Sequence, residues 1–365
     1  MSEIKTENDS NKPSFNKTKL IVLFVTWILF LLLIVFGIII YTKGQESQRQ
    51  KGEQGDGLNR CATFVGGGSI YDFDYYENTY YMLHGGKTIY RSDSGDTWTP
   101  ISMPTDSGFK FDDKVLYFEI FNGKIFTAQS NGTVKESVYV YDIKTNTWKR
   151  ETVGGYIHQI KEVNGQLVAL TNANKAVNNG YNLFVRRENG NWQGVTIMNG
   201  SKILDSSLHD ICYAGGRYTV VGSNGAIAST TNLLGNWTYY ASYADEKYNF
   251  ESIMHDGTCY VLGIMDDTET NNLILSGRDL SVLYPAIVNS NGGVQRVRAF
   301  ECFDGKIYAC AFAGDNSKGE LLVSSNNGLT WNVMVDDYKP MKALKTIGSK
   351  LYIGGTSEIY YLEKS

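Results

Sequence analysis

Side chains that could do chemistry recur along this chain at intervals of 41 to 51 residues. They carry imidazole, carboxylate, guanidinium, amine and phenol groups, and they are Asp72, Tyr117, His158, His209, Asp210, Glu251, Arg298 and Lys342. Imidazole and carboxylate are usual metal ligands, but no local spacing of a metal motif is present, so we predict no metal and no other cofactor. Both charges together with aromatic rings suit a neutral or zwitterionic ligand, such as a glycan or a peptide. The alternative is that polar residues simply gather where strands end near water.

Each of these residues lies six or seven positions before the turn of a motif that occurs seven times. In every copy, apolar residues alternate with other residues around a tight turn, and several turns read Asn-Gly or Asp-Gly. This pattern predicts a β-hairpin. The predicted turns lie at Asn78, Gly123, Gly165, Gly216, Gly257, Gly305 and Ser349.

The tryptophans outside the N-terminal segment repeat with the same period. Their gaps are 50, 44, 45 and 94 residues, the last being two periods with a missing copy near Leu283, and they are Trp98, Trp148, Trp192, Trp237 and Trp331. A period of this length with four short strands predicts an all-β, seven-bladed β-propeller over residues 61–365. We expect a strand at 61–68 to complete the last blade and so remove two exposed sheet edges. The strand starts of all blades would then meet at one channel mouth.

An uncharged apolar segment at residues 20–41 precedes this domain, bracketed by Lys19 and Lys43. Its 22 positions are enough to span a bilayer as a helix, and the run is longer than that of a cleaved signal peptide. We therefore predict a tail at 1–19, a single transmembrane helix at 20–41 and a flexible stalk at 42–60. A small excess of lysine before the span places the N-terminus in the cytoplasm and the propeller outside, at a plasma or cell-envelope membrane.

Charge and cysteine content limit the possible partners. The formal charge is −4 and no run of Lys or Arg occurs, so we expect no nucleic-acid surface. Of five cysteines, Cys302 and Cys310 share a hairpin, but its turn places Cys302 near Ile307, which makes a bridge between them geometrically poor. Cys61, at the end of the stalk, is the candidate for a link between two subunits.

Two octets, "RSDSGDTW" at 91–98 and "SSNNGLTW" at 324–331, carry a resemblance. They look like the Asp-box (BNR) repeat, roughly S-x-D-x-G-x-T-W, found between the third and fourth strands of blades in sialidase- and sortilin-type propellers. Arg91 stands where Ser is usual, and Asn326 replaces Asp. The resemblance implies a turn-stabilising role for Asp93, Gly95, Thr97, Trp98, Ser324, Asn326, Gly328, Thr330 and Trp331.

A sialidase, as this resemblance implies it, needs three arginines that converge from inner strands. Only Arg298 occupies the start of an innermost strand, so we assign no catalytic residue. We expect a membrane-anchored extracytoplasmic propeller that binds a glycan or protein, as in adhesion or reception. The alternatives are a scaffold or assembly factor of a membrane complex, and a sialidase-like glycoside hydrolase or lyase that uses the carboxylates of the ring.

Overall fold

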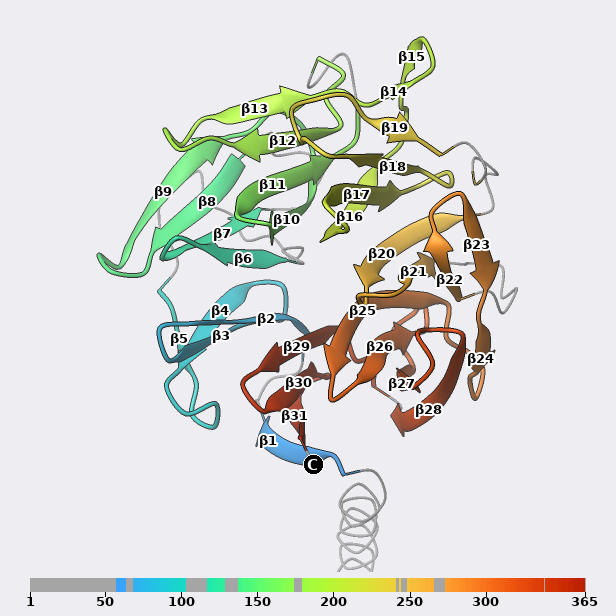
Figure 1. The fold of residues 1–365 in the computed structure, drawn as a ribbon. Coiled ribbons are helices and arrows are strands. Elements are labelled where there is room, and N and C mark those ends of the chain that lie inside the picture. Colours follow the sequence, from blue (N-terminus) through green and yellow to red (C-terminus); the bar gives the residue numbers. More distant parts are fainter. Residues whose placement is uncertain are drawn as a thin grey trace, which may run out of the picture. The chain divides into compact units, whose positions relative to one another are not determined.

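A ring of repeated antiparallel β-sheets makes up the described part of the chain in a computed structural model (Figure 1). The structure describes residues 57–63, 68–102, 117–128, 137–173, 179–240, 243, 248–265, 273–337 and 339–364. The predicted tail and transmembrane segment lie outside these residues, as does most of the predicted stalk. Within the described ranges, no helix is long and apolar enough to cross a membrane.

Four separate sheets follow one another along the first two thirds of the ring, each with four strands paired in chain order. The first contains β2 (Ile70–Tyr76), β3 (Thr79–His84), β4 (Thr88–Ser92) and β5 (Thr99–Pro100). The second contains β6 (Phe118–Phe121), β7 (Lys124–Ala128), β8 (Ser137–Asp142) and β9 (Thr147–Thr152). The third contains β10 (Ile157–Val163), β11 (Gln166–Thr171), β12 (Leu183–Arg186) and β13 (Trp192–Val195). After a small hairpin of β14 (Met198–Asn199) and β15 (Lys202–Ile203), the fourth contains β16 (Leu208–Ala214), β17 (Arg217–Gly222), β18 (Ile227–Thr230) and β19 (Thr238–Tyr239).

The next part of the ring departs from the prediction of seven separate four-stranded blades. Its nine strands form one sheet: β20 (Asn249–His255), β21 (Tyr260–Met265), β22 (Ile274–Asp279), β23 (Val282–Pro285), β24 (Ile287–Asn289), β25 (Arg296–Phe303), β26 (Lys306–Phe312), β27 (Gly319–Ser324) and β28 (Thr330–Asp337). Two contacts join it, because β24 pairs in parallel with β28 and Met265 pairs with Arg296. Five four-stranded sheets are therefore separate in the described residues, not seven.

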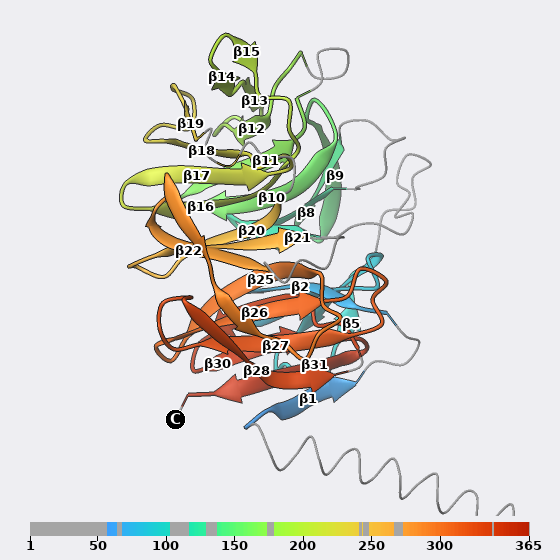
Figure 2. The ribbon, with the colours of Figure 1, turned by 90° about the vertical axis from the view of Figure 1, so that its right-hand side faces the viewer.

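The predicted closure of the ring is confirmed. The last sheet contains β29 (Ala343–Ile347), β30 (Lys350–Gly354) and β31 (Glu358–Glu363), and β1 (Asn59–Thr63) pairs antiparallel with β31 as its outer strand. The first strands contact one another in a closed cycle, in the order β2, β6, β10, β16, β20, β25, β29 and back to β2. They lie nearest the centre of the ring in Figure 1, and Figure 2 shows the sheets following one another from the side.

All seven predicted hairpins are present between the first and second strands. Their turns place residues in the left-handed region of the backbone, as Asn122 (φ 50°) and Gly123 (φ 70°) do. Paired left-handed residues match the twist of the flanking strands, and Asn and Gly are the residues that tolerate this conformation best. The Asn-Gly and Asp-Gly signals in the sequence were therefore reliable.

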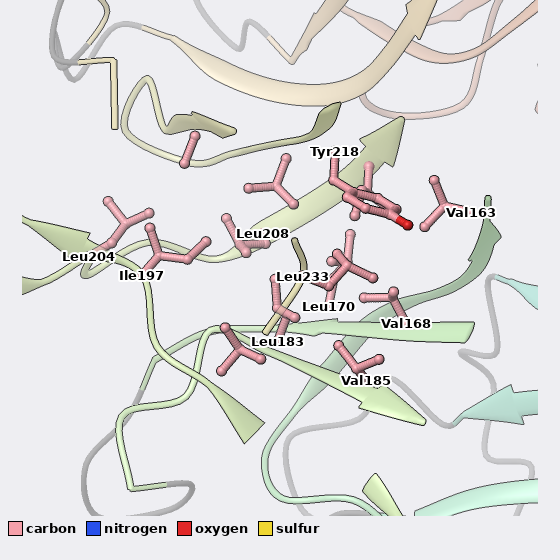
Figure 3. Packing of buried hydrophobic residues seen from close by; sticks show 14 of the residues in the cluster. Val163, Val168, Leu170, Leu183, Val185, Ile197, Leu204, Leu208, Tyr218 and Leu233 are labelled. Carbon is pink, nitrogen blue, oxygen red and sulfur yellow. The ribbon is translucent and has the colours of Figure 1, made fainter. Parts of the chain in front are cut away.

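Neighbouring sheets pack face to face through alternate apolar residues. In one such cluster, Val168, Leu170 and Leu183 of the third sheet meet Val220 and Ala228 of the fourth, and all are fully buried (Figure 3). The predicted tryptophans lie in or just before the fourth strand of their unit, and Trp331 is fully buried. Leu283, at the position of the missing copy, lies buried in β23.

The two octets form similar loops between third and fourth strands. Trp98 Nε1 donates to Gly95 O at 2.7 Å, and Trp331 Nε1 donates to Gly328 O at 2.9 Å. In the second loop, Asn326 Oδ1 also accepts from Thr330 N at 2.9 Å.

A serine hydroxyl accepts from the glycine N–H in each octet loop, which corrects the alignment of the octets. Ser324 Oγ accepts from Gly328 N at 3.0 Å, and Ser92 Oγ accepts from Gly95 N at 2.9 Å. Ser92, not position 91, thus corresponds to Ser324. Asp93 is exposed and, within the described residues, accepts one long hydrogen bond, from Thr79 Oγ1 at 3.4 Å. It does not take the part of Asn326.

The cysteines of the described residues are free thiols. Cys302 pairs with Ile307 across its hairpin, as the sequence predicted. Cys61 Sγ donates to Gly95 O at 3.0 Å, so it ties β1 to the first octet loop, and burial together with the Asp96 carboxylate raises the pKa of its thiol to about 12. A link between subunits through Cys61 stays a prediction.

Two glycines offer a matched test of the packing between the two halves of the nine-stranded sheet. Gly328 (φ 79°) has no room for a side chain, since a Cβ there would lie 2.3 Å from Val261 Cγ1, whereas Gly348 (φ 61°) faces open space. We expect Gly348→Ala to lower the free energy of unfolding by about 1–2 kcal/mol, from backbone strain alone. Gly328→Ala should lose about 1–3 kcal/mol more through overpacking. Equal losses in a urea titration would show that the Val261 contact is not tight.

Candidate ligand-binding site

Five of the first strands contain one extra residue at equivalent positions. In β2, Ile70 pairs with His84 and Asp72 with Leu83, which leaves Tyr71 between them without a partner in the ladder. Such a bulge bends the strand and redirects a side chain. The equivalent register shifts fall at His158, His209, Glu251 and Arg298, four of the predicted site residues.

The aromatic and cationic members of the predicted set meet at the centre of the ring. The Arg298 guanidinium carbon lies 4.3 Å from the centroid of the Tyr117 ring and 5.4 Å from that of Tyr71. Lys342 Nζ lies 4.8 Å from the Tyr71 centroid. These residues belong to, or directly precede, four different first strands, and cations at such distances are attracted to the faces of aromatic rings.

The two histidines of the set also meet. The rings of His158 and His209 lie 5.5 Å apart in a T-shaped arrangement, and His209 Nδ1 lies 2.8 Å from the Phe250 carbonyl oxygen, to which it must donate. Burial, and then the neighbouring His209, lower the pKa of His158 to about 4. His158 is therefore neutral at physiological pH.

The two predicted aspartates join neighbouring strands. Asp72 Oδ2 accepts from Phe118 N at 3.2 Å, which links β2 to β6. Asp210 Oδ2 accepts from Ile253 N at 2.9 Å, and its Oδ1 lies 2.7 Å from Lys161 Nζ, so that it joins β16 to both β20 and β10. Their oxygens are thus engaged by the protein itself.

A second ring of charged residues, which the sequence reasoning missed, lies two residues further along the same strands. Its members are Asp74, Glu119, Lys161, Glu301 and Lys345. Asp74 Oδ1 lies 3.2 Å from Lys345 Nζ, and Asp74 Oδ2 accepts from Ile120 N at 3.1 Å. The signal was available, because alternate residues of a strand share a face and the count of 45 applies to each of them equally.

Burial of these carboxylates shifts their titration toward neutral pH. It raises the pKa of Asp72 to about 7 and that of Glu119 to about 8, although the Lys345 ammonium opposes both shifts. For Lys345, burial lowers the pKa, but the carboxylates of Asp74 and Glu119 outweigh it and the net direction is upward. At neutral pH the ring centre therefore holds a protonated Glu119 and a charged Lys345.

The arrangement offers charge and hydrogen bonds for recognition. Cations lie against aromatic rings at the level of the bulges, and carboxylates with their lysine partners follow two residues deeper. Within the described residues, no group of three or more His, Cys, Asp or Glu side chains is placed to hold a metal ion. The geometry is that of a binding surface with two layers of different charge.

Comparison with known proteins supports the fold. The chain matches no protein-family model and no curated protein sequence. Among solved structures, YCF48 from Cyanidioschyzon merolae is similar with a TM-score of 0.58 and 12% identity, over 84% of this chain and 98% of that one. YCF48 bound to D1 peptide gives 0.57 and 12%, over 84% and 96%.

An extracellular domain is also similar. That of the putative one component system BT4673 from B. thetaiotaomicron gives a TM-score of 0.57 and 13% identity, over 83% of this chain and 42% of that one. At such identities these likenesses show a β-propeller fold alone. They do not confirm the Asp-box assignment or the sialidase-type resemblance.

The buried carboxylates predict how stability depends on pH. Glu119 and Asp72 keep protons in the folded state that the unfolded chain releases near pH 4.5 and 3.8, so their stabilising effect is lost as pH rises through about 8 and 7. His158 acts in the opposite direction, but only below its ordinary pKa of 6.5. Between pH 6.5 and 8 we therefore expect the free energy of unfolding to fall, by at most about 1.4 kcal/mol per pH unit for each proton.

Substitution of Glu119 tests this assignment by urea denaturation at several pH values. Glu119→Gln should flatten the decline, since an amide does not titrate, whereas the exposed Glu188→Gln should leave it unchanged. An identical slope for wild type and Glu119→Gln would show that Glu119 ionises normally in the folded protein.

Proposed function

We propose that this protein is a membrane-anchored extracytoplasmic β-propeller that binds a peptide segment of a protein partner at the centre of its ring. The observation that carries the proposal is the convergence of Arg298, Lys342, Tyr71 and Tyr117 from four first strands. Cationic and aromatic side chains are the ones that most often supply binding energy at protein interfaces. They converge here without serving as an apolar core.

Two likenesses support this choice of ligand and location. One of the similar propellers was solved with a bound peptide, and another is an extracellular domain. Because both rest on fold alone, the case for a peptide depends on the ring residues of this chain. The case for the anchor depends on the uncharged segment at 20–41 and on the lysines that flank it. Within the same proposal, the octet loops act as Asp-box-type turns that support the blades.

An exposed apolar patch favours a scaffold as the second candidate function. Tyr284 and Ile287 are each 64% exposed, Leu329 is 55% exposed, and Ile287 N donates to Leu329 O, so the patch follows the outer edge of the nine-stranded sheet. Apolar side chains clustered at a surface often mark a protein contact. A scaffold would use this outer edge, whereas the proposed receptor uses the ring centre.

Affinity measurements on the full chain decide between the two surfaces. A photo-crosslinking residue placed at Tyr71 would capture the partner in native membranes, and peptides of that partner would then be titrated. Arg298→Ala should weaken binding about 5- to 150-fold, from the loss of about 1–3 kcal/mol of contacts to a charged group. The exposed Arg278→Ala serves as the matched control and should bind normally.

Other outcomes of this experiment are informative. Loss of binding for Ile287→Asp but not Arg298→Ala would favour the scaffold. Binding to a glycan array but to no peptide, with the same sensitivity to Arg298→Ala, would replace the peptide by a glycan.

The proposed topology is tested separately. Protease added to intact cells should degrade the ring domain while an epitope placed before residue 20 survives, because the anchor orients the chain with its N-terminus inside. Full protection of the domain, with a known surface protein degraded in the same sample, would contradict the extracytoplasmic location.

A further inference from the structure

Lys342 is a buried ammonium with no anionic partner in the part of the chain that the structure describes. The residue is 6% exposed, and its Nζ faces the Tyr71 ring at 4.8 Å and the Phe312 ring at 5.2 Å. Aromatic faces attract a cation, but they leave its three N–H donors without strong acceptors. A buried charge is ordinarily both paired and hydrogen-bonded.

The other lysines of the ring centre have carboxylate partners. Lys161 Nζ lies 2.7 Å from Asp210 Oδ1, and Lys345 Nζ lies 3.2 Å from Asp74 Oδ1. Lys342 thus differs from its neighbours in the same ring, although it begins the same strand as Lys345.

A second buried cation lies beside Lys342. Arg298 is 8% exposed, and its guanidinium shares the Tyr71 ring with the Lys342 ammonium. Burial, and then the charge of Arg298, lower the pKa of Lys342 to about 8, while Glu251 opposes this shift. Two like charges held together in a poorly solvated place destabilise the protein unless an anion joins them.

We infer that Lys342 and Arg298 form a subsite for a carboxylate group of the ligand, with Tyr71 and Tyr117 holding the two cations in place. The inference rests on the proposed ligand-binding function and specifies what the ligand must present. Glu251 acts on the Lys342 charge, and Asp72 lies within the influence of Arg298, so negative groups already border the subsite. They favour a singly charged carboxylate over a doubly charged phosphate, which they would repel more strongly.

The subsite should depend on pH in a defined direction. Lys342 carries its charge below about pH 8, so carboxylate binding should be strong at neutral pH and lost as pH rises through that value. Because a bound anion stabilises the ammonium, occupation of the subsite should in turn raise the pKa of Lys342.

Titration of the purified full chain with sodium acetate, at constant ionic strength, tests the subsite directly. Lys342→Met should weaken acetate binding about 10- to 150-fold, as expected for the loss of a hydrogen bond to a charged group. Lys350→Met is the matched control, since Lys350 Nζ also stacks on a tyrosine, at 4.0 Å from the Tyr361 centroid, but away from the ring centre. Inorganic phosphate should bind more weakly than acetate, and choline should not bind.

A second variant keeps the test sound if Lys342→Met misfolds. Lys342→Arg retains a charge that does not titrate near pH 8, so its acetate binding should persist above the pH at which wild type loses it. Acetate binding that is unaffected by Lys342→Met, or phosphate binding tighter than acetate, would overturn the inference.

The result can be separated from that of the proposed function. Acetate binding at Lys342 together with normal partner binding by Arg298→Ala would leave the subsite standing and refute the proposed function. The absence of acetate binding, with partner binding still lost in Arg298→Ala, would refute the subsite alone.

Discussion

The inner edge of each first strand has no further strand to pair with, and this constraint determines what lies at the ring centre. An unpaired edge presents backbone N–H and C=O groups that lose free energy when they are buried without partners. Side chains of the neighbouring first strand supply those partners. Asp72 and Asp74 accept from the amides of β6, Asp210 accepts from an amide of β20, and Ser252 Oγ donates to Val297 O of β25 at 2.8 Å.

The charge of the ring centre follows from this solution. Carboxylates accept hydrogen bonds from amides well, but each brings a negative charge into a place with little water, and lysines then neutralise part of it. Lys161 and Lys345 serve this purpose, and they bind strands on opposite sides of the ring. The residues at the bulges are not needed for these links, which leaves Arg298 and Lys342 available for another task.

The sequence predicted those features that depend on neighbours along the chain. The Asn122–Gly123 turn and the tryptophan of β28 follow from local backbone preference and from period, and both lie where they were expected. The pairing of β24 with β28 was not predictable, because three residues carry no pattern and their partner lies 43 positions away. The same limit applies to the site. Periodicity brought Asp210 and Lys342 to equivalent strand starts, but only the packing of neighbouring strands decides that Asp210 is consumed by internal bonds.

The pairing of β1 with β31 has a consequence for biosynthesis. Arg60 pairs with Tyr360, so a strand made near the start of the domain waits for a partner made 300 residues later. At typical rates of about 5–20 residues per second, the ribosome needs about 15–60 seconds to cover that distance. During this time the nascent chain exposes the edge of β1 and the inner face of every finished sheet at the open end. Ring closure is thus a post-synthetic event, and the interval before it is when this protein most needs a chaperone.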